Sequence, residues 1–303
     1  MVQGLRILLF MFITRPEEGR LKEAFLILKS ETPEKIIATT PVGVQEFVFS
    51  KGHFLPALRT PVGLKRIDVT RFHDYVARDP YEKMEQVMRL ADFKEIAKIN
   101  RDYWEKYIKS EFARSRAQIV VVRRINPYSP AQSLLTFNSQ IPLIASDLFH
   151  AVSESNEKIR KAVSVLMNSI FALAYVFSKK EETTGRYIDI RQHDLYGMRL
   201  FPDQNQVEKL VKVYEKYRDK EFPSLREQLD IHFKNRYEFF WAKERKKHMP
   251  LISPPQIEPH PLRLEFDLDV IKSVGSSLTK DDLLKAYEAI VWDMIITRKL
   301  RKD

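Results

Sequence analysis

Three carboxylates stand on alternate positions of the segment EFDLD, at Glu265, Asp267 and Asp269. On an extended strand this spacing would turn all three toward one face, where their oxygens could bind a divalent metal ion. On a helix the same residues would spread over different faces. The surrounding sequence favours two helices, so we expect the solvated start of a helix here and no metal site.

Histidine and cysteine offer little further chemistry. Cysteine is absent, which excludes disulfides, thiolate zinc sites and cysteine nucleophiles. The seven histidines include no HxH or HExxH pair, so we expect ordinary surface or core histidines. A nuclease pattern of the Asp…Glu-x-Lys kind has no match either. We therefore predict no catalytic residues in this chain.

The eight glycines are too widely spaced to form a phosphate-binding loop. No two of them lie within three residues of one another. Rossmann turns, P-loops and the cofactor loop of S-adenosylmethionine methyltransferases all need closely spaced glycines, because the backbone must approach the ligand. We expect no cofactor in this chain.

The charge balance indicates a polyanionic partner. Lys plus Arg outnumber Asp plus Glu by 51 to 41, which gives a net charge of +10. Nucleic acid is the common partner of such a surface, and the alternative is a surplus of solvated lysines.

The apolar run at 7–13 is too short for a bilayer, which needs about 20 residues, so we expect a soluble, cytoplasmic protein without a membrane partner.

The elements that must position these residues change in type along the chain. In the N-terminal part, four short apolar runs predict strands, at 7–13, 24–28, 35–39 and 46–49. The first two of these runs, on either side of a Pro/Gly turn, predict a hairpin. From residue 80 to 112, apolar residues three and four apart predict a helix.

The second half of the chain is richer in helix. Strands are predicted at 117–125, 133–139 and 187–192, and one helix at 155–177. Residues 203–247 predict helix divided by Pro223. The last segment predicts two helices, the second of which is capped by Thr279 with Asp282.

Residues 165–202 contain, in order, an Asn-Ser pair on a helix, a Gly-Arg loop, a strand, an Asp-Leu pair and a proline. Residues 263–295 contain an Arg-x-x-x-Asp start, a later glycine and a Tyr-x-x-Ile helix. Both stretches resemble the target-recognition and C-terminal region of the type IIG and related Eco57I-like adenine-N6 DNA methyltransferases. The matching positions are Asn168, Ser169, Gly185, Arg186, Asp194, Leu195, Pro202, Arg263, Asp267 or Asp269, Gly275, Tyr287 and Ile290.

The resemblance covers residues 113–303 and lacks the catalytic half of that family. It implies a DNA sequence-recognition subunit of a restriction–modification system, working beside a methyltransferase catalytic subunit that would hold S-adenosylmethionine. The alternatives are a complete DNA-modifying enzyme with an unrecognised site and a helical assembly protein.

The loop at 123–130 is the strongest candidate for reading DNA. Its Asn126-Pro127-Tyr128 resembles the tetrad with which DNA methyltransferases hold a flipped base, but no cofactor loop precedes it, so we interpret the likeness as accidental. The basic segment 178–191 is a second candidate, or else a solvated turn. The predicted DNA contacts are Arg114, Arg116, Arg123, Arg124, Asn126, Tyr128, Lys179, Lys180, Arg186 and Arg191.

We therefore predict an α+β protein with double-stranded DNA as its partner. A β-rich N-terminal region with helices would occupy 1–112. A mixed α/β recognition unit would follow over 113–202, and a long-helical C-terminal region over 203–303.

Overall fold

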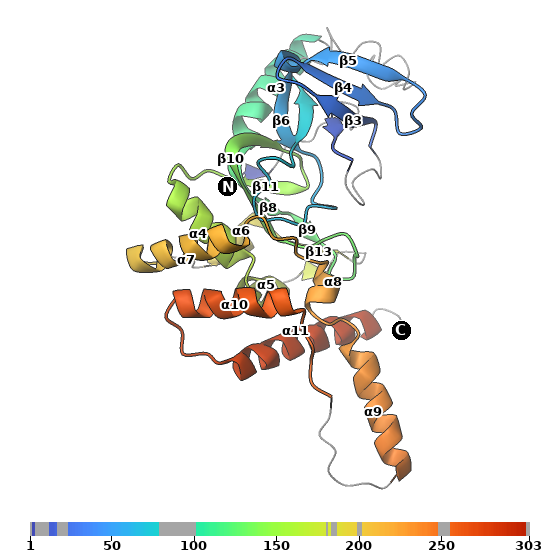
Figure 1. Cartoon of the computed structure of the whole chain (residues 1–303), viewed down its shortest axis with the longest axis vertical. Helices are drawn as coiled ribbons and strands as arrows, with labels where there is room; N and C mark the ends of the chain where they lie inside the picture. The colour runs from blue at the N-terminus through green and yellow to red at the C-terminus, as the bar shows by residue number, and fades with distance from the viewer. Residues whose placement is uncertain are drawn as a thin grey trace.

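The computed structural model describes residues 2–3, 12–16, 24–78, 101–179, 181–182, 187–198, 202–247 and 255–300. A ten-stranded mixed sheet dominates the N-terminal half, and helices gather at the opposite end of the molecule (Figure 1). This arrangement confirms the predicted α+β class.

The strands of the large sheet follow the order β1-β11-β8-β10-β6-β7-β2-β3-β4-β5. Their bounds are β1 Val2–Gln3, β2 Phe12–Thr14, β3 Leu26–Glu31, β4 Lys35–Thr39, β5 Glu46–Ser50, β6 Phe54–Leu58, β7 Asp74–Ala77, β8 Arg116–Val122, β10 Thr136–Ala145 and β11 Phe149–Val152. A separate three-stranded sheet has the order β12-β13-β9. Its bounds are β9 Arg124–Ile125, β12 Glu181–Glu182 and β13 Ile188–Asp189.

The predicted strand runs at 24–28, 35–39 and 46–49 are confirmed as β3, β4 and β5. In β5 buried and exposed side chains alternate, as expected for a half-buried strand. The hairpin predicted between the first two runs is wrong for the described residues, because Ile13 of β2 pairs with Leu26 of β3 in a parallel ladder. The neighbour of β2 on its other side is β7, which is antiparallel. Residues 4–11 lie outside the described part.

One α-helix, α3 (Arg101–Ser115), packs against the large sheet, and the other α-helices of the described residues lie in the second half of the chain. The bounds of these others are α4 Glu157–Met167, α5 Ile170–Ser178, α6 Gln192–Gly197, α7 Gln204–Tyr217, α8 Leu225–Gln228, α9 Phe233–Lys247, α10 Pro261–Ser273 and α11 Lys280–Leu300. α7 packs against both α4 and α10, and α9 extends away from the other helices (Figure 1). The largest buried cluster joins β8 and β10 to α4, α7 and α10.

The helix predicted at 155–177 is two helices, α4 and α5, which meet at an angle of 64°. Asn168 lies at the break, and its side-chain amide forms hydrogen bonds with the first residue of β10 and the residue before it. Its Oδ1 accepts from the N–H groups of Leu135 and Thr136, at 2.8 and 3.0 Å, and its Nδ2 donates to the carbonyl of Thr136. Asn168 thereby ends α4 and fixes the helix on the sheet.

Local signals at other helix ends are confirmed. Pro223 lies between α7 and α8. At the start of α11, Thr279 and Asp282 exchange hydrogen bonds, with the Thr279 N–H 2.8 Å from Asp282 Oδ2. Of the predicted helix at 80–112, residues 101–112 lie in α3, and the rest falls outside the described residues.

The large sheet continues across the boundary predicted at residue 112. β6 from the first region pairs in parallel with β10 from the second, at Ile144 and Ala57. The division into regions 1–112, 113–202 and 203–303 therefore remains a prediction about function, and the first two regions share one sheet. Among the described residues, no helix taken alone combines the length and apolarity needed to cross a membrane.

Candidate nucleic-acid interface

The two segments predicted to read DNA lie side by side. β9, from the loop at 123–130, pairs antiparallel with β13, from the segment at 178–191. Arg124 is opposite Asp189 in this ladder, and the N–H of Ile190 donates to the carbonyl of Arg123 at 2.7 Å. Segments more than fifty residues apart in sequence thus form one small sheet with β12.

Asp189 holds the two arginines of this sheet. Its Oδ1 lies 3.4 Å from the Nε of Arg124 and 3.8 Å from that of Arg123. Arg123 also donates to the carbonyl of Asp147 and is four-fifths buried, whereas about half of the Arg124 side chain is exposed. Arg124 is therefore the better placed of the two to contact a ligand.

Two further predicted cations flank the sheet. Lys179 is exposed at the C-terminal end of α5, with its Nζ 6.0 Å from the centre of the Tyr175 ring. Arg191 is exposed at the start of α6, where its N–H donates to Asp194. Below them, buried His150 holds the carbonyl of Ile190 through Nε2 at 2.6 Å, and burial lowers the pKa of this imidazole. The segment at 187–191 is thus anchored on β11.

Asn126 and Tyr128 have internal partners. Asn126 Oδ1 accepts from the N–H of Tyr128 at 3.1 Å, which closes a turn of the Asx kind. The Tyr128 hydroxyl donates to the carbonyl of Met294 in α11 at 2.6 Å, and its ring packs on a buried cluster. A contact of either side chain with DNA would have to replace these interactions.

The remaining candidates are not part of this group. Arg116 is exposed at the other end of β8, about 20 Å from Arg123 by the rise of the strand, and Arg114 is exposed in the last turn of α3, just ahead of β8. Arg114 forms an ion pair with Glu111. Lys180 and Arg186 lie outside the described residues. The structure therefore brings together Arg123, Arg124, Lys179 and Arg191.

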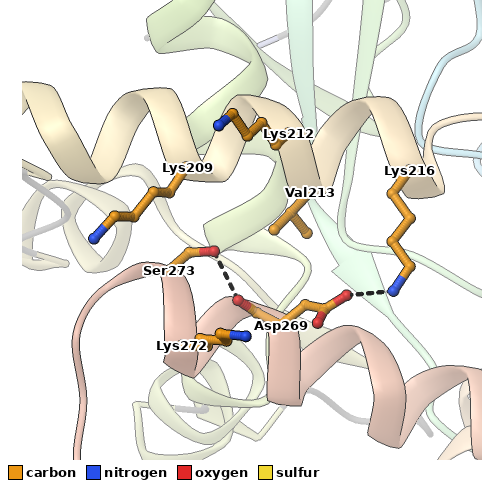
Figure 2. A pocket seen from close by; sticks show the side chains of 7 residues that line it. All are labelled: Lys209, Lys212, Val213, Lys216, Asp269, Lys272 and Ser273. Atoms are coloured by element: carbon orange, nitrogen blue, oxygen red, sulfur yellow. Dashed lines mark hydrogen bonds and ion pairs between the residues drawn. The ribbon is translucent and has the colours of Figure 1, made fainter.

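A basic groove that was not predicted lies between α7 and α10 (Figure 2). It has a volume of about 570 Å³ and is lined by Lys209, Lys212, Val213, Lys216, Asp269, Lys272 and Ser273. Lys216 bonds to Asp269 at 2.7 Å and to Glu265 at 2.8 Å, and these hydrogen bonds raise the pKa of Lys216. The spacing of Lys209, Lys212 and Lys216 was visible in the sequence, but the facing Lys272 was not predictable from it.

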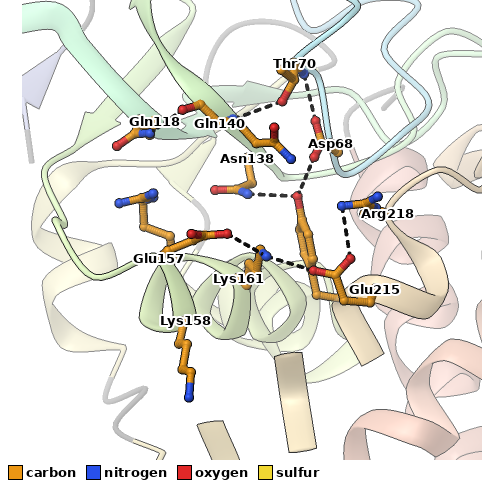
Figure 3. Close-up of polar contacts among 12 residues, drawn as sticks. Asp68, Thr70, Gln118, Asn138, Gln140, Glu157, Lys158, Lys161, Glu215 and Arg218 are labelled. Atoms are coloured by element: carbon orange, nitrogen blue, oxygen red, sulfur yellow. Dashed lines mark hydrogen bonds and ion pairs between the residues drawn. The ribbon is translucent and has the colours of Figure 1, made fainter. Parts of the chain in front are cut away.

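A second polar cluster joins α7 to the large sheet (Figure 3). The hydroxyl of Tyr214 donates to Asp68 at 2.9 Å and accepts from Nδ2 of Asn138 at 2.8 Å. Tyr214 is fully buried, and burial raises the pKa of its phenol. Because its proton is held by Asp68, Tyr214 fixes α7 against β10 rather than reaching a ligand. On the surface above it, Lys161 bridges Glu157 and Glu215.

The EFDLD carboxylates lie on a helix, as predicted, but Asp267 is not solvated. It is fully buried in α10, and its Oδ2 accepts from Nε of Arg263 at 2.8 Å and from the hydroxyl of Tyr287. Its Oδ1 accepts from the N–H of Ile170 at 2.9 Å and so caps α5. The burial of this charge is possible because Arg263, one turn earlier in α10, and two residues distant in sequence, Tyr287 and Ile170, all bond to it.

Several residues that carry the family resemblance have structural roles. Asn168 ends α4, and Arg263, Asp267 and Tyr287 form one buried network. Gly275 ends α10 with a φ of +71°, which a residue with a side chain adopts at a cost. Gly185 and Arg186 lie outside the described residues. Across the described part of the chain, no three His, Asp or Glu side chains are placed to hold a metal ion.

No family model matches the chain, and no curated protein matches it. A solved structure that is similar is that of the type IIG restriction endonuclease BpuSI, with 12% sequence identity and a TM-score of 0.47. The similarity covers 80% of this chain and 26% of that chain, so this chain spans about a quarter of the length of BpuSI. At this level of similarity, a function for this chain has to be argued from its own residues.

Proposed function

We propose that this chain recognises a sequence in double-stranded DNA as the specificity component of an adenine-N6 DNA methyltransferase in a restriction–modification system. The main support is the sheet β12-β13-β9, in which Arg124 lies opposite Asp189, while Lys179 precedes β12 and Arg191 follows β13 in the chain. The net charge of +10 is of the sign that DNA binding requires. In the proposal a separate catalytic subunit holds S-adenosylmethionine and methylates the adenine.

Within this proposal Arg124 and Lys179 have different roles. An arginine can donate two hydrogen bonds to the edge of a guanine in the major groove, and Asp189 would hold Arg124 ready for this contact. Lys179 would neutralise a phosphate, which fixes position but carries no sequence information. Arg191 could serve either way.

The test is the salt dependence of duplex binding, measured by fluorescence anisotropy. Combined Lys179→Gln, Arg124→Gln and Arg191→Gln substitutions should flatten the slope of log K against log salt by about 1 to 2, because Lys179 and Arg191 supply one or two phosphate contacts and each lost contact removes about 0.9. The matched control, Lys35→Gln with Lys280→Gln and Lys285→Gln, removes the same charge from exposed positions elsewhere. Equal slopes for the two variants would exclude this surface.

A single substitution separates base reading from charge. Arg124→Lys keeps the charge and loses the planar fork, so discrimination between sites should fall while the salt slope stays unchanged. The assignment to methylation has its own test, which is to add a methyltransferase chain that lacks a recognition region. If duplex DNA is bound neither by this chain at low salt nor by the two chains together, the proposal is wrong.

A further inference from the structure

The groove between α7 and α10 concentrates positive charge without neutralising it. Lys209 and Lys212 on α7 and Lys272 on α10 are exposed, and none of the described residues forms an ion pair with them. The one carboxylate that lines the groove, Asp269, is already bonded to Lys216 and to the hydroxyl of Tyr217 at 2.8 Å. Three of the four lysines are therefore uncompensated.

This arrangement is unfavourable for the free protein. Lys212 lies three residues from Lys209 and four from Lys216, spacings at which like charges on a helix repel by a few tenths of a kcal/mol per pair. The acids at the same spacings from Lys212, Glu208 and Glu215, pair with Lys158 and Lys161 of α4 instead. The helix dipole favours Lys272 and Lys216, which lie in the last turns of α10 and α7. It gives no such benefit to Lys209 and Lys212 in the middle of α7, so their placement calls for another explanation.

The residues that line the groove offer few kinds of group that could recognise an anion. Val213 and the lysine stems supply apolar surface, and the hydroxyl of Ser273 already donates to the carbonyl of Asp269 at 2.7 Å. The free donors are flexible ammonium groups, which bind phosphate as point charges and read no base or sugar. The ligand is thus selected by charge and not by shape.

The number of free lysines indicates more than one phosphate. Lys209 and Lys212 on α7 and Lys272 on α10 bring three uncompensated positive charges to the groove (Figure 2). A single phosphate group carries at most about two negative charges at pH 7 and would not balance all three. We propose that the groove between α7 and α10 binds a chain of phosphate groups, contributed either by a nucleic-acid strand or by a free polyphosphate.

The site is separate from the sheet β12-β13-β9 and does not depend on the proposed function. Its test uses a variant with Lys209→Gln, Lys212→Gln and Lys272→Gln in the full chain. The control is again Lys35→Gln, Lys280→Gln and Lys285→Gln, which carries the same net charge. All six lysines are exposed, and loss of like-charge repulsion should leave the melting temperature of the groove variant at or above that of the wild type.

Two ligands distinguish the two sources of phosphate. Inorganic tripolyphosphate is titrated by calorimetry, and duplex DNA by fluorescence anisotropy over a range of salt. Weaker DNA binding by the groove variant than by the control identifies a nucleic-acid strand, with about tenfold lost per contact near 0.1 M salt. Weaker tripolyphosphate binding alone, by about tenfold or more, identifies a free polyphosphate. Equal behaviour of the groove variant and the control toward both ligands would overturn the proposal.

Failure here can be told from failure of the proposed function. The groove variant keeps Arg124, Lys179 and Arg191, and the variant of those three residues keeps the groove. A loss confined to one variant assigns the contact to that surface.

Discussion

Two ion networks at opposite ends of this protein each join a carboxylate to an arginine and a tyrosine, but in different surroundings. In the helical half, Asp267 accepts from Arg263 and from Tyr287. In the β-rich half, Glu31 of β3 accepts from Arg15 at 2.6 Å, from Lys51 at 2.7 Å and from Tyr75. The Arg263 and Asp267 side chains are 1% and 0% exposed, whereas those of Arg15 and Glu31 are 20% and 27% exposed.

The difference in burial changes what each network does. Burial raises the pKa of Asp267, and the Arg263 guanidinium opposes that effect. Burial opposes the charge on Glu31 as well, but hydrogen bonds from Lys51, Tyr75 and Arg15 outweigh it and lower the pKa of Glu31 to about 2. The buried network depends on each of its partners, since water cannot replace any of them. The network around Glu31 can exchange partners with solvent.

The buried network also connects more elements. Arg263 donates to Gln228 of α8 at 3.3 Å, and Gln228 donates to the carbonyl of Ser133 ahead of β10 at 2.7 Å. Asp267 holds the first N–H of α5, and Tyr287 belongs to α11. Four helices are therefore positioned through one carboxylate.

The sharpest way to break this comparison is Asp267→Ala. It leaves the Arg263 charge buried and unpaired and uncaps α5, so we expect about 3 to 5 kcal/mol lower free energy of unfolding. Urea denaturation followed by circular dichroism measures this. Asp269→Ala, two residues along the same helix, is the matched control and should cost about 1 kcal/mol or less, since Asp269 is 31% exposed. Equal losses would contradict a special role for burial.

The two tyrosines offer a matched pair. Tyr287→Phe removes a buried hydrogen bond to a charged group, for which we expect a loss of about 1.5 to 3 kcal/mol. Tyr75→Phe removes the corresponding bond to Glu31, where Lys51, Arg15 and water remain as donors, and should cost about half as much or less. If the Tyr75 variant is the more damaged of the two in urea, the networks do not differ as burial implies.

Local patterns predicted the elements of this fold but not their pairing. The strand at 35–39 and the cap formed by Thr279 depend on neighbours in sequence, and both are confirmed. The parallel pairing of Ile13 with Leu26 depends on which strands meet in the sheet, and the run at 24–28 contains no signal for it. The break at Asn168 was missed for the same reason, because its amide bonds to Leu135 and Thr136, which are more than thirty residues away in the sequence.

The candidate site shows the same limit. The segments at 123–130 and 178–191 were selected from their charge, while their pairing through Arg124 and Asp189 follows from the fold. Asp267 was expected in solvent because the three carboxylates of EFDLD spread over different faces of a helix, which is typical of a solvated helix start. The burial of its charge depends on Tyr287 and Ile170, which are distant in sequence.

A smaller effect is expected when Glu31 is neutralised. Glu31→Gln keeps the size of the side chain and loses two partly exposed ion pairs, so we expect a loss of about 1 kcal/mol. Added salt should reduce this loss, because solvent ions screen exposed pairs. The loss in Asp267→Ala should change little with salt. A Glu31 effect that does not depend on salt would place its charges in a drier environment than their exposure indicates.

The smallest expected change in stability comes from lowering the pH, which should weaken the network around Glu31 first. The folded-state pKa of Glu31 is lowered from 4.5 to about 2. The contribution of its charge is therefore fully present above pH 4.5 and is lost as the pH falls toward about 2, where the folded protein also binds the proton. The difference in urea midpoint between wild type and Glu31→Gln should thus be constant near neutral pH and shrink between these two values. A difference that persists unchanged at pH 2 would mean that the hydrogen bonds made at position 31, rather than its charge, stabilise the β-rich half.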